Sequence, residues 1–180
     1  MADSSASGAI DSPLAVLGAW HRLGEPQFEA LQRLARRSPI ASPEAAEQDA
    51  ARAVLAWFER TVAVHHRDEE DDLFPELIES MAGSDPVCLR ELAAAATAGH
   101  RVVESLWRRL RPACVALSRG SAATLDADAV TALVDGCRDN FLRADRELLP
   151  MAERLLDDAA LERLRVRMDE RRRASDASGH

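Results

Sequence analysis

Apolar residues that recur at helical spacing in four long stretches constrain the fold more than any other feature of this chain. The stretches begin near residues 13, 43, 86 and 127, and short breaks containing glycine, serine or proline separate them. Within each stretch, leucine, valine, phenylalanine and tryptophan return at intervals of three and four residues, which places them on one face of a helix. No strand-like alternation competes, so the sequence predicts an all-α fold.

Four long helices joined by short loops are predicted to pack as an up-down-up-down four-helix bundle. This bundle is expected to occupy residues 13–157. Residues 1–12 are small and polar and read as a disordered lead-in. Residues 158–180 are expected to form a short amphipathic C-terminal extra helix followed by a polar tail.

Prolines and glycines mark the expected ends and irregularities of these helices. Gly24 and Pro26 predict an interruption of the first helix, and Pro75 predicts a kink in the second. Pro150 lies near the end of the fourth helix. The Asp-Pro pair at residues 85–86 predicts the start of the third helix, because aspartate favours the N-cap and proline the first turn.

The charge balance excludes several classes of partner. All 23 basic residues are arginine, they face 31 acidic residues, and the formal net charge is −8. A chain this acidic is a poor candidate for general nucleic-acid binding or for docking on an anionic membrane. We therefore expect neither nucleic acid nor a membrane among its partners.

Cysteine usage and the absence of targeting signals predict a cytoplasmic protein. The three cysteines Cys88, Cys114 and Cys137 are an odd number without CxxC spacing, so we expect free, buried thiols. The first residues lack the charged and apolar regions of a signal peptide. No apolar run approaches the roughly 20 residues of a membrane span.

Two histidine–glutamate pairs are the candidate chemical residues. His65 and Glu69 are four residues apart, and His100 and Glu104 repeat that spacing on the third helix, so each pair lies on one helical face. A lone histidine on an apolar face is more often a hydrogen-bonded core residue than a metal ligand. One His-Glu pair alone is as often a surface interaction as a pair of metal ligands. Both pairs together with His21 would be costly buried polarity unless a metal ion satisfied it. Such ligands, projected from facing helices, are typical of di-iron or di-manganese sites in bundles.

A second pair, His66 and Glu70, competes with the first for the core-facing position. It is rotated by about 100° from His65 and Glu69, so both pairs cannot face the same core. The spacing alone leaves this choice open. The rest of the acidic run over residues 68–72 is expected to be a solvated face.

Two motifs resemble those of hemerythrin-like (HHE cation-binding) domains. The stretch HHRDEEDDLFP at residues 65–75 resembles the family's second-helix signature and is the specific one. The stretch RADRELLPMAE at residues 143–153 is similar to its closing motif. With His21 and His100 at the expected places, the resemblance covers roughly residues 13–156.

The resemblance implies a four-helix bundle with a non-haem di-iron centre. One iron would bind His21 and His65. Glu69 would bridge it to the second iron, which would bind His100 and Glu104. Asp145 matches a second bridging carboxylate in the fourth helix. The metal ligands implied in this way are His21, His65, Glu69, His100, Glu104 and Asp145.

The fourth helix departs from the family pattern at Asn140. The family has a histidine at this position, five residues before the bridging carboxylate, and often a tyrosine shortly before it; this chain has no tyrosine. An amide oxygen is a weaker iron ligand than imidazole. Three outcomes stay open: an iron with an open coordination position, a single metal at His21, His65 and Glu69, or a bundle that has lost its metal.

The function implied by the resemblance is iron-dependent binding or sensing of O2, NO or peroxide, or the handling of iron. A di-iron oxidase or oxygenase is the rival from the enzyme class, because an open iron position beside a bridging carboxylate is where dioxygen is activated. A metal-free interaction module is the third alternative. A mononuclear site, or a divalent metal other than iron, is compatible with the same ligands.

Overall fold

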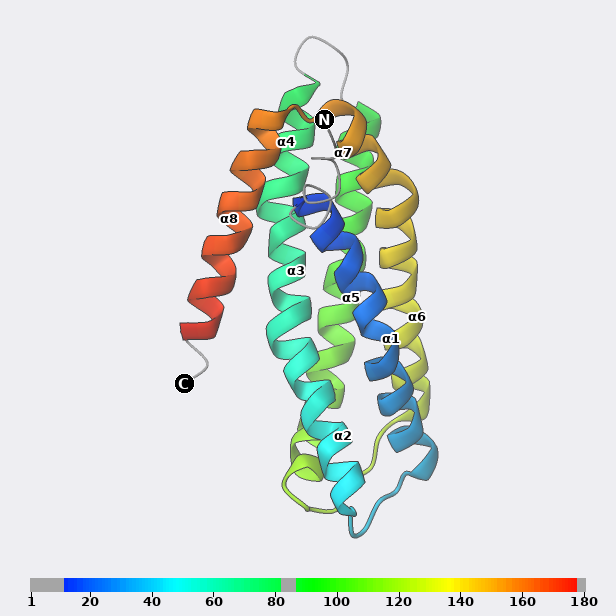
Figure 1. The fold of residues 1–180 in the computed structure, drawn as a ribbon. Helices are drawn as coiled ribbons and strands as arrows, with labels where there is room; N and C mark the ends of the chain where they lie inside the picture. The colour runs from blue at the N-terminus through cyan, green and yellow to red at the C-terminus, as the bar shows by residue number, and fades with distance from the viewer. Residues whose placement is uncertain (1–11, 82–86, 178–180) are drawn as a thin grey trace, which may run out of the picture. The chain divides into compact units, whose positions relative to one another are not determined.

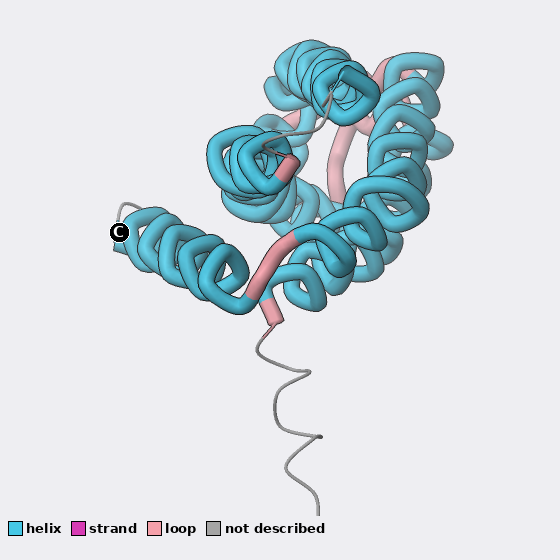
Figure 2. Tube along the Cα trace, turned by 90° about the horizontal axis from the view of Figure 1, so that it is seen from above, coloured by secondary structure: helices cyan, strands magenta, loops and turns pink. Residues whose placement is uncertain are grey.

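The ordered secondary structure is helical, as the sequence predicts. A computed structural model of the chain describes residues 12–81 and 87–177, and these residues form helices and loops but no strand (Figure 2). Most of the expected disordered lead-in, the Asp-Pro pair at residues 85–86 and the end of the polar tail lie outside the described residues. None of the described helices combines the length and apolar character that crossing a bilayer requires.

The helical segments follow the predicted order along the chain (Figure 1). The segments are α1 (Pro13–Arg37), α2 (Ala45–Ala56), η1 (Trp57–Val62), α3 (Ala63–Arg67), η2 (Asp68–Leu73), α4 (Phe74–Ser80), α5 (Val87–Ser118), α6 (Ala127–Arg143), η3 (Ala144–Leu148), α7 (Leu149–Leu155) and α8 (Asp158–Ala177). Those labelled η are π-helical turns. The predicted interruption of the first helix is wrong, because α1 continues through Gly24 and Pro26.

Two π-helical turns lead into Pro75 and Pro150 without a break in the helix. In η2 the backbone N–H at the C-cap, Phe74, donates to the carbonyl oxygen of Glu69, five residues earlier, just before Pro75. In η3 the N–H of Leu149 donates to the carbonyl of Ala144, just before Pro150. A proline ring would clash with the carbonyl four residues before it in an α-helix, and the wider turn relieves that crowding.

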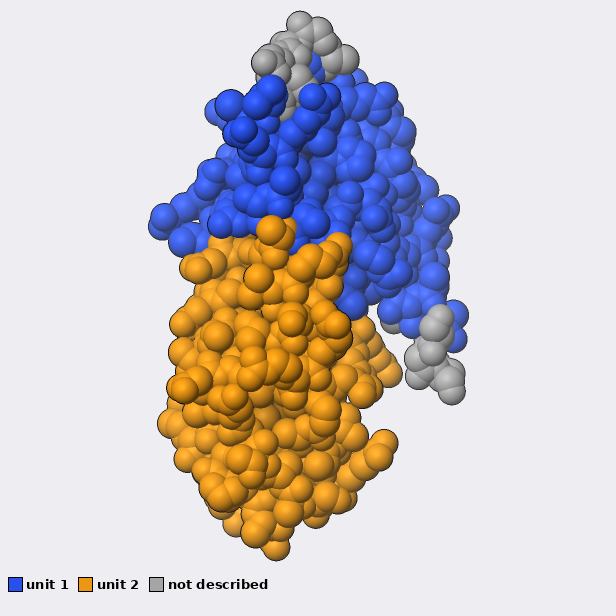
Figure 3. All heavy atoms as spheres, turned by 180° about the vertical axis from the view of Figure 1, so that it is seen from behind, with its two compact units in different colours: residues 1–20, 63–97, 141–180 blue, residues 21–62, 98–140 orange. Residues whose placement is uncertain are grey.

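The chain divides into two compact units, which Figure 3 distinguishes by colour. The first unit comprises residues 1–20, 63–97 and 141–180. Its core is a cluster of small and aliphatic side chains in which Leu17, Leu73, Leu77, Leu164 and Met168 have no exposed surface. Complete burial of a leucine contributes about 1.5–3 kcal/mol. Since α8 supplies Leu164 and Met168, the predicted extra helix is part of this core.

The second unit comprises residues 21–62 and 98–140 and has an aromatic centre. The rings of Phe58 and Trp107 stack with 4.4 Å between centroids and 17° between planes, and Phe28 approaches Phe58 at 6.5 Å. All three rings are buried. At the end of this unit Ile40 and Ala123 exchange backbone hydrogen bonds of 3.0 Å, which tie the loop after α1 to the loop after α5.

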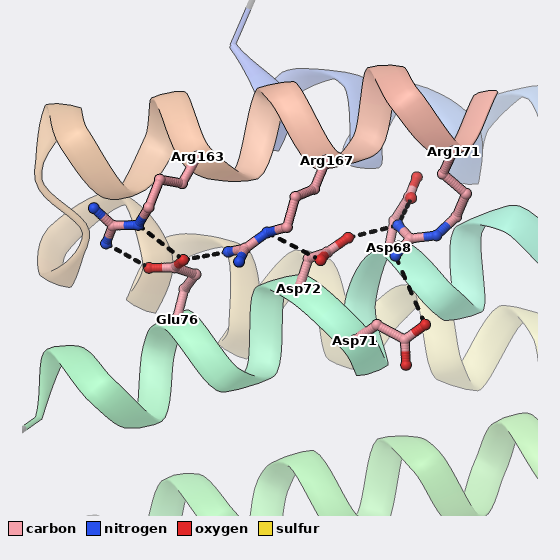
Figure 4. Close-up of polar contacts among 7 residues, drawn as sticks. All are labelled: Asp68, Asp71, Asp72, Glu76, Arg163, Arg167 and Arg171. Atoms are coloured by element: carbon pink, nitrogen blue, oxygen red, sulfur yellow. Dashed lines mark hydrogen bonds and ion pairs between the residues drawn. The ribbon is translucent and has the colours of Figure 1, made fainter. Parts of the chain in front are cut away.

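An arginine ladder joins α8 to η2 and α4 inside the first unit (Figure 4). We give this name to three arginines and three carboxylates, each set spaced by four residues: Arg163, Arg167, Arg171, Asp68, Asp72 and Glu76. Each arginine contacts one or more of the carboxylates, which are buried. The prediction of a solvated acidic face is therefore wrong for Asp68 and Asp72, although Asp71 is exposed.

We predict that Cys88 is the one thiol that reacts in the folded protein. Cys88 is exposed, contrary to the sequence-based expectation, whereas Cys114 and Cys137 are buried. Burial raises the pKa of both buried thiols to about 12, so almost no thiolate forms near neutral pH. Titration with a chromogenic disulfide should count one reactive thiol in the native protein and three in guanidinium chloride. Rapid native reaction of a Cys88→Ser variant would contradict this.

A Glu76→Gln substitution tests the ladder. Hydrogen bonds from Arg163, and after it Arg167, hold the pKa of Glu76 below its ordinary value of 4.5. The carboxylate therefore stabilises the fold above about pH 4.5, and that contribution disappears as the pH falls through the lowered pKa. Because both arginines are about half exposed, we expect a loss of only about 1–2 kcal/mol at pH 7.

Urea unfolding at pH 7 and at successively lower pH measures this loss. The difference between wild type and Glu76→Gln should shrink as the pH falls below 4.5. Glu79→Gln is the matched control, because Glu79 is an exposed glutamate on the same helix, and it should change stability by less than about 0.5 kcal/mol. Equal losses in the two variants would refute the ladder's contribution.

Candidate metal centre

His65 and Glu69 form the centre of the candidate site. His65 lies in α3 and Glu69 in the following turn η2, so one helical turn separates them. His65 Nε2 and Glu69 Oε1 are 3.6 Å apart, and the side chains are only 4% and 2% exposed. An ionised carboxylate at this depth requires a cationic or hydrogen-bonding neighbour. The pair thus combines a nitrogen and an oxygen donor where water has little access.

His21 of α1 joins this pair. His21, His65 and Glu69 each offer one ligand atom, and these atoms all lie within 4.8 Å of one another. All three residues are buried. Among the residues that the structure describes, this is the group of histidine and carboxylate side chains close enough to hold a metal ion together.

The donor set fits iron. Two imidazole nitrogens and one carboxylate oxygen form the 2-His-1-carboxylate combination that is typical of non-haem Fe(II) sites. Imidazole also suits zinc, copper and nickel, so the donors select a class of transition metals rather than one element. Calcium and magnesium prefer all-oxygen sites and fit less well. The residues therefore match the kind of metal that the sequence motifs imply.

Aromatic neighbours surround His65. The ring of Phe141 meets that of His65 edge-on, with centroids 6.0 Å apart and an interplanar angle of 81°. His66 is also buried, with its ring centroid 6.2 Å from that of His65, but it is not a member of the candidate group. Of the two competing pairs, His65 with Glu69 is thus the one that lies beside His21.

The other three residues implied as ligands lie outside this group. His100 is buried in α5. Glu104, one turn further along α5, is half-buried and forms an ion pair of 2.6 Å with Arg101. Asp145 lies in η3 with its residue exposed to solvent. The structure thus brings together three of the six implied ligands.

Asn140 packs tightly against α5. A Cβ atom added to Gly99 would lie 2.1 Å from Asn140 Oδ1, so the asparagine and the glycine are in close contact. Gly99 immediately precedes the buried His100. A residue with a side chain at position 99 would displace the amide. Asn140 therefore fills space beside the helical turn that carries His100, at the position where the family pattern has a histidine.

A buried carboxylate next to Glu69 shapes the electrostatics of η2. Burial raises the pKa of Asp68 to about 6, although the hydrogen bond from Arg171 opposes this rise.

The pairing of Asp68 with an arginine was not predicted from the sequence. A signal was present, because the arginines at 163, 167 and 171 repeat the four-residue spacing of the carboxylates at 68, 72 and 76. Matched spacings of opposite charge indicate two helices that lie side by side.

Comparison with known protein families agrees with this geometry. The family model described as hemerythrin HHE cation binding domain matches residues 21–152. A search of curated proteins finds no relative of the chain. The family match covers well over half of the chain and contains all the residues that the motifs imply as metal ligands. The chain belongs to the hemerythrin HHE cation-binding domain family.

Proposed function

We propose that this protein binds non-haem iron in an up-down-up-down four-helix bundle and uses it to bind or sense O2, NO or peroxide. The observation that carries the proposal is the buried group of His21, His65 and Glu69. Iron held by two imidazoles and one carboxylate supplies coordination positions that stay open to a small ligand. Membership of the cation-binding family supports the same assignment.

The proposal includes a second, weaker metal position. By their match to the family motif, His100, Glu104 and Asp145 would hold this second metal, with Glu69 as a carboxylate within reach of both metals. With Asn140 in place of a histidine, this position has one strong donor fewer. A metal at His21 and His65 would therefore bind more tightly, and the second would be more readily lost.

The chain's own residues prepare the site in three ways. Glu69 supplies negative charge that offsets part of the charge of the cation. Burial of His65 and Glu69 keeps bulk water away from the donors, which strengthens their electrostatic interaction with a cation. The edge-on contact with Phe141 restrains the imidazole plane of His65, so the ring reorganises less on binding.

A non-haem iron oxidase or oxygenase, di-iron or mononuclear, is the second candidate, and the donor set is the observation that favours it. Two histidines and one carboxylate with open positions are also the ligands of Fe(II) oxygenases. Mixing the reduced protein with oxygen separates the two functions. A reversible optical spectrum supports binding or sensing, whereas turnover that consumes a co-substrate supports catalysis.

Substitution of His65 by alanine should abolish the tighter site. We expect the wild-type protein, purified with iron supplied, to hold at least about one iron per chain by elemental analysis. His65→Ala should reduce that content by about tenfold or more, because it removes one of three clustered donors. His66→Ala is the matched control, since His66 is a buried neighbour outside the group. Substoichiometric metal that His65→Ala leaves unchanged would refute the proposal.

Substitution of Asn140 by histidine should strengthen the second position. We expect metal content to rise toward about two per chain, because imidazole is a stronger iron ligand than an amide. Asn140→Asp adds a charged donor of almost unchanged shape, so it tests the same point without a larger ring against Gly99. Asn140→Ala adds no donor and serves as the control. Unchanged stoichiometry in the first two variants would mean that residue 140 lies outside the coordination shell.

A further inference from the structure

The turn that carries Glu69 has buried acids beside the candidate ligand. Asp68 precedes Glu69 in η2 and Asp72 follows it three residues later, and the three residues are 0%, 2% and 3% exposed in chain order. Glu69 belongs to the candidate metal group, whereas Asp68 and Asp72 contact α8. One short π-helical turn therefore supplies side chains both to the candidate metal group and to the contact with α8.

Arg171 of α8 gathers the two flanking carboxylates. Its Nη1 donates to Asp68 Oδ1 and also, at 2.5 Å, to Asp72 Oδ2, while Nη2 lies 3.7 Å from Asp71 Oδ2 (Figure 4). The guanidinium is planar and its donors are fixed relative to one another. A single group that binds both Asp68 and Asp72 restrains the backbone between them, and Glu69 lies in that stretch.

Docking of α8 does not depend on Arg171 alone. Leu164 and Met168 on α8 are completely buried in the core of the first unit, and Ala160 is nearly so. Arg163 and Arg167 bind Glu76, and Arg167 also approaches Asp72 at 3.1 Å. Removal of the Arg171 guanidinium should therefore release the carboxylates of η2 while α8 stays in place.

We propose that α8 positions the metal centre: Arg171, acting through Asp68 and Asp72, holds η2 in the conformation that presents Glu69 next to His65. Arg171 is a positioning residue, because it contacts the turn and not the metal group. The inference rests on the proposed metal binding. It makes α8, which supplies none of the implied ligands, one of the elements that determine the affinity for the metal.

An Arg171→Gln variant tests the positioning role through two measurements. Titration with Fe(II) under anaerobic conditions should show about tenfold weaker binding than wild type, at the lower end of the effect of losing a residue that supports ligands. Amide hydrogen exchange of the metal-free protein should become faster across residues 68–73, which form η2. Arg171→Lys keeps the charge but replaces the delocalised guanidinium with a shorter side chain that ends in a compact ammonium, so it should restore only part of the affinity.

Two matched controls separate positioning from general destabilisation. Arg165 forms ion pairs with Glu162 and Asp169 within α8, so Arg165→Gln should leave the Fe(II) affinity within about twofold of wild type. Arg163→Gln breaks the far end of the ladder at Glu76. The amide exchange rates of η2 in this variant should match those in Arg165→Gln. If Arg171→Gln does not fold, Asp68→Asn weakens the contact between Arg171 and η2 with little change of shape.

The outcomes distinguish this inference from the proposed function. If wild type binds Fe(II) and Arg171→Gln binds it as tightly as Arg165→Gln, the positioning role is wrong and metal binding stands. If wild type binds no metal, the proposed function is wrong, and the positioning of Glu69 for a metal falls with it. Faster exchange in η2 together with an affinity loss specific to Arg171→Gln would establish the inference.

Discussion

The structure depends on how four buried carboxylates on one helical stretch are neutralised. Asp68, Glu69, Asp72 and Glu76 are each at most 5% exposed, and an ionised carboxylate at that depth is unfavourable without a partner. Three of them meet arginines of α8. The fourth, Glu69, lies beside His65 and His21. The same stretch therefore divides its carboxylates between an arginine helix and a candidate metal group.

Helical geometry separates the two arginine-bound carboxylates from Glu69. In a uniform α-helix, Asp68 and Asp72 are four residues apart and share one face, and Glu69 is turned about 100° from Asp68. The wider turn before Pro75 changes the angular spacing locally, so the side chains after Glu69 are offset from α-helical register. Asp145 lies in a second such turn, before Pro150. In both places a proline and a π turn accompany a carboxylate of the family motif.

Much of the fold and part of the site could be predicted from the sequence. Helical spacing of apolar residues gave the all-α class. The four-residue spacing left His65 with Glu69 and His66 with Glu70 as rivals, and the resemblance to the family motif selected the first pair. The helical route through Pro26 and the π turns could not be predicted, because they depend on what surrounds each proline. The burial of Asp68 and Asp72 was also missed, since a charge run identifies its partner only when a distant helix packs against it. The exposure of Cys88 likewise depends on packing that spacing does not encode.

The arginine ladder shows one structural use of a composition in which every basic residue is arginine. Arg171 reaches Asp68 and Asp72 together, and Arg167 reaches Asp72 and Glu76, so each of these guanidiniums bridges two carboxylates. Two arginines thereby link three carboxylates along the helix. Arg167 bridges through two nitrogens of its planar guanidinium, Nε and Nη2, an arrangement that the single compact ammonium of lysine cannot reproduce. Since Glu69 lies in the chain between Asp68 and Asp72, the proposed effect of α8 on the metal centre would act through the contacts of these two carboxylates with Arg171.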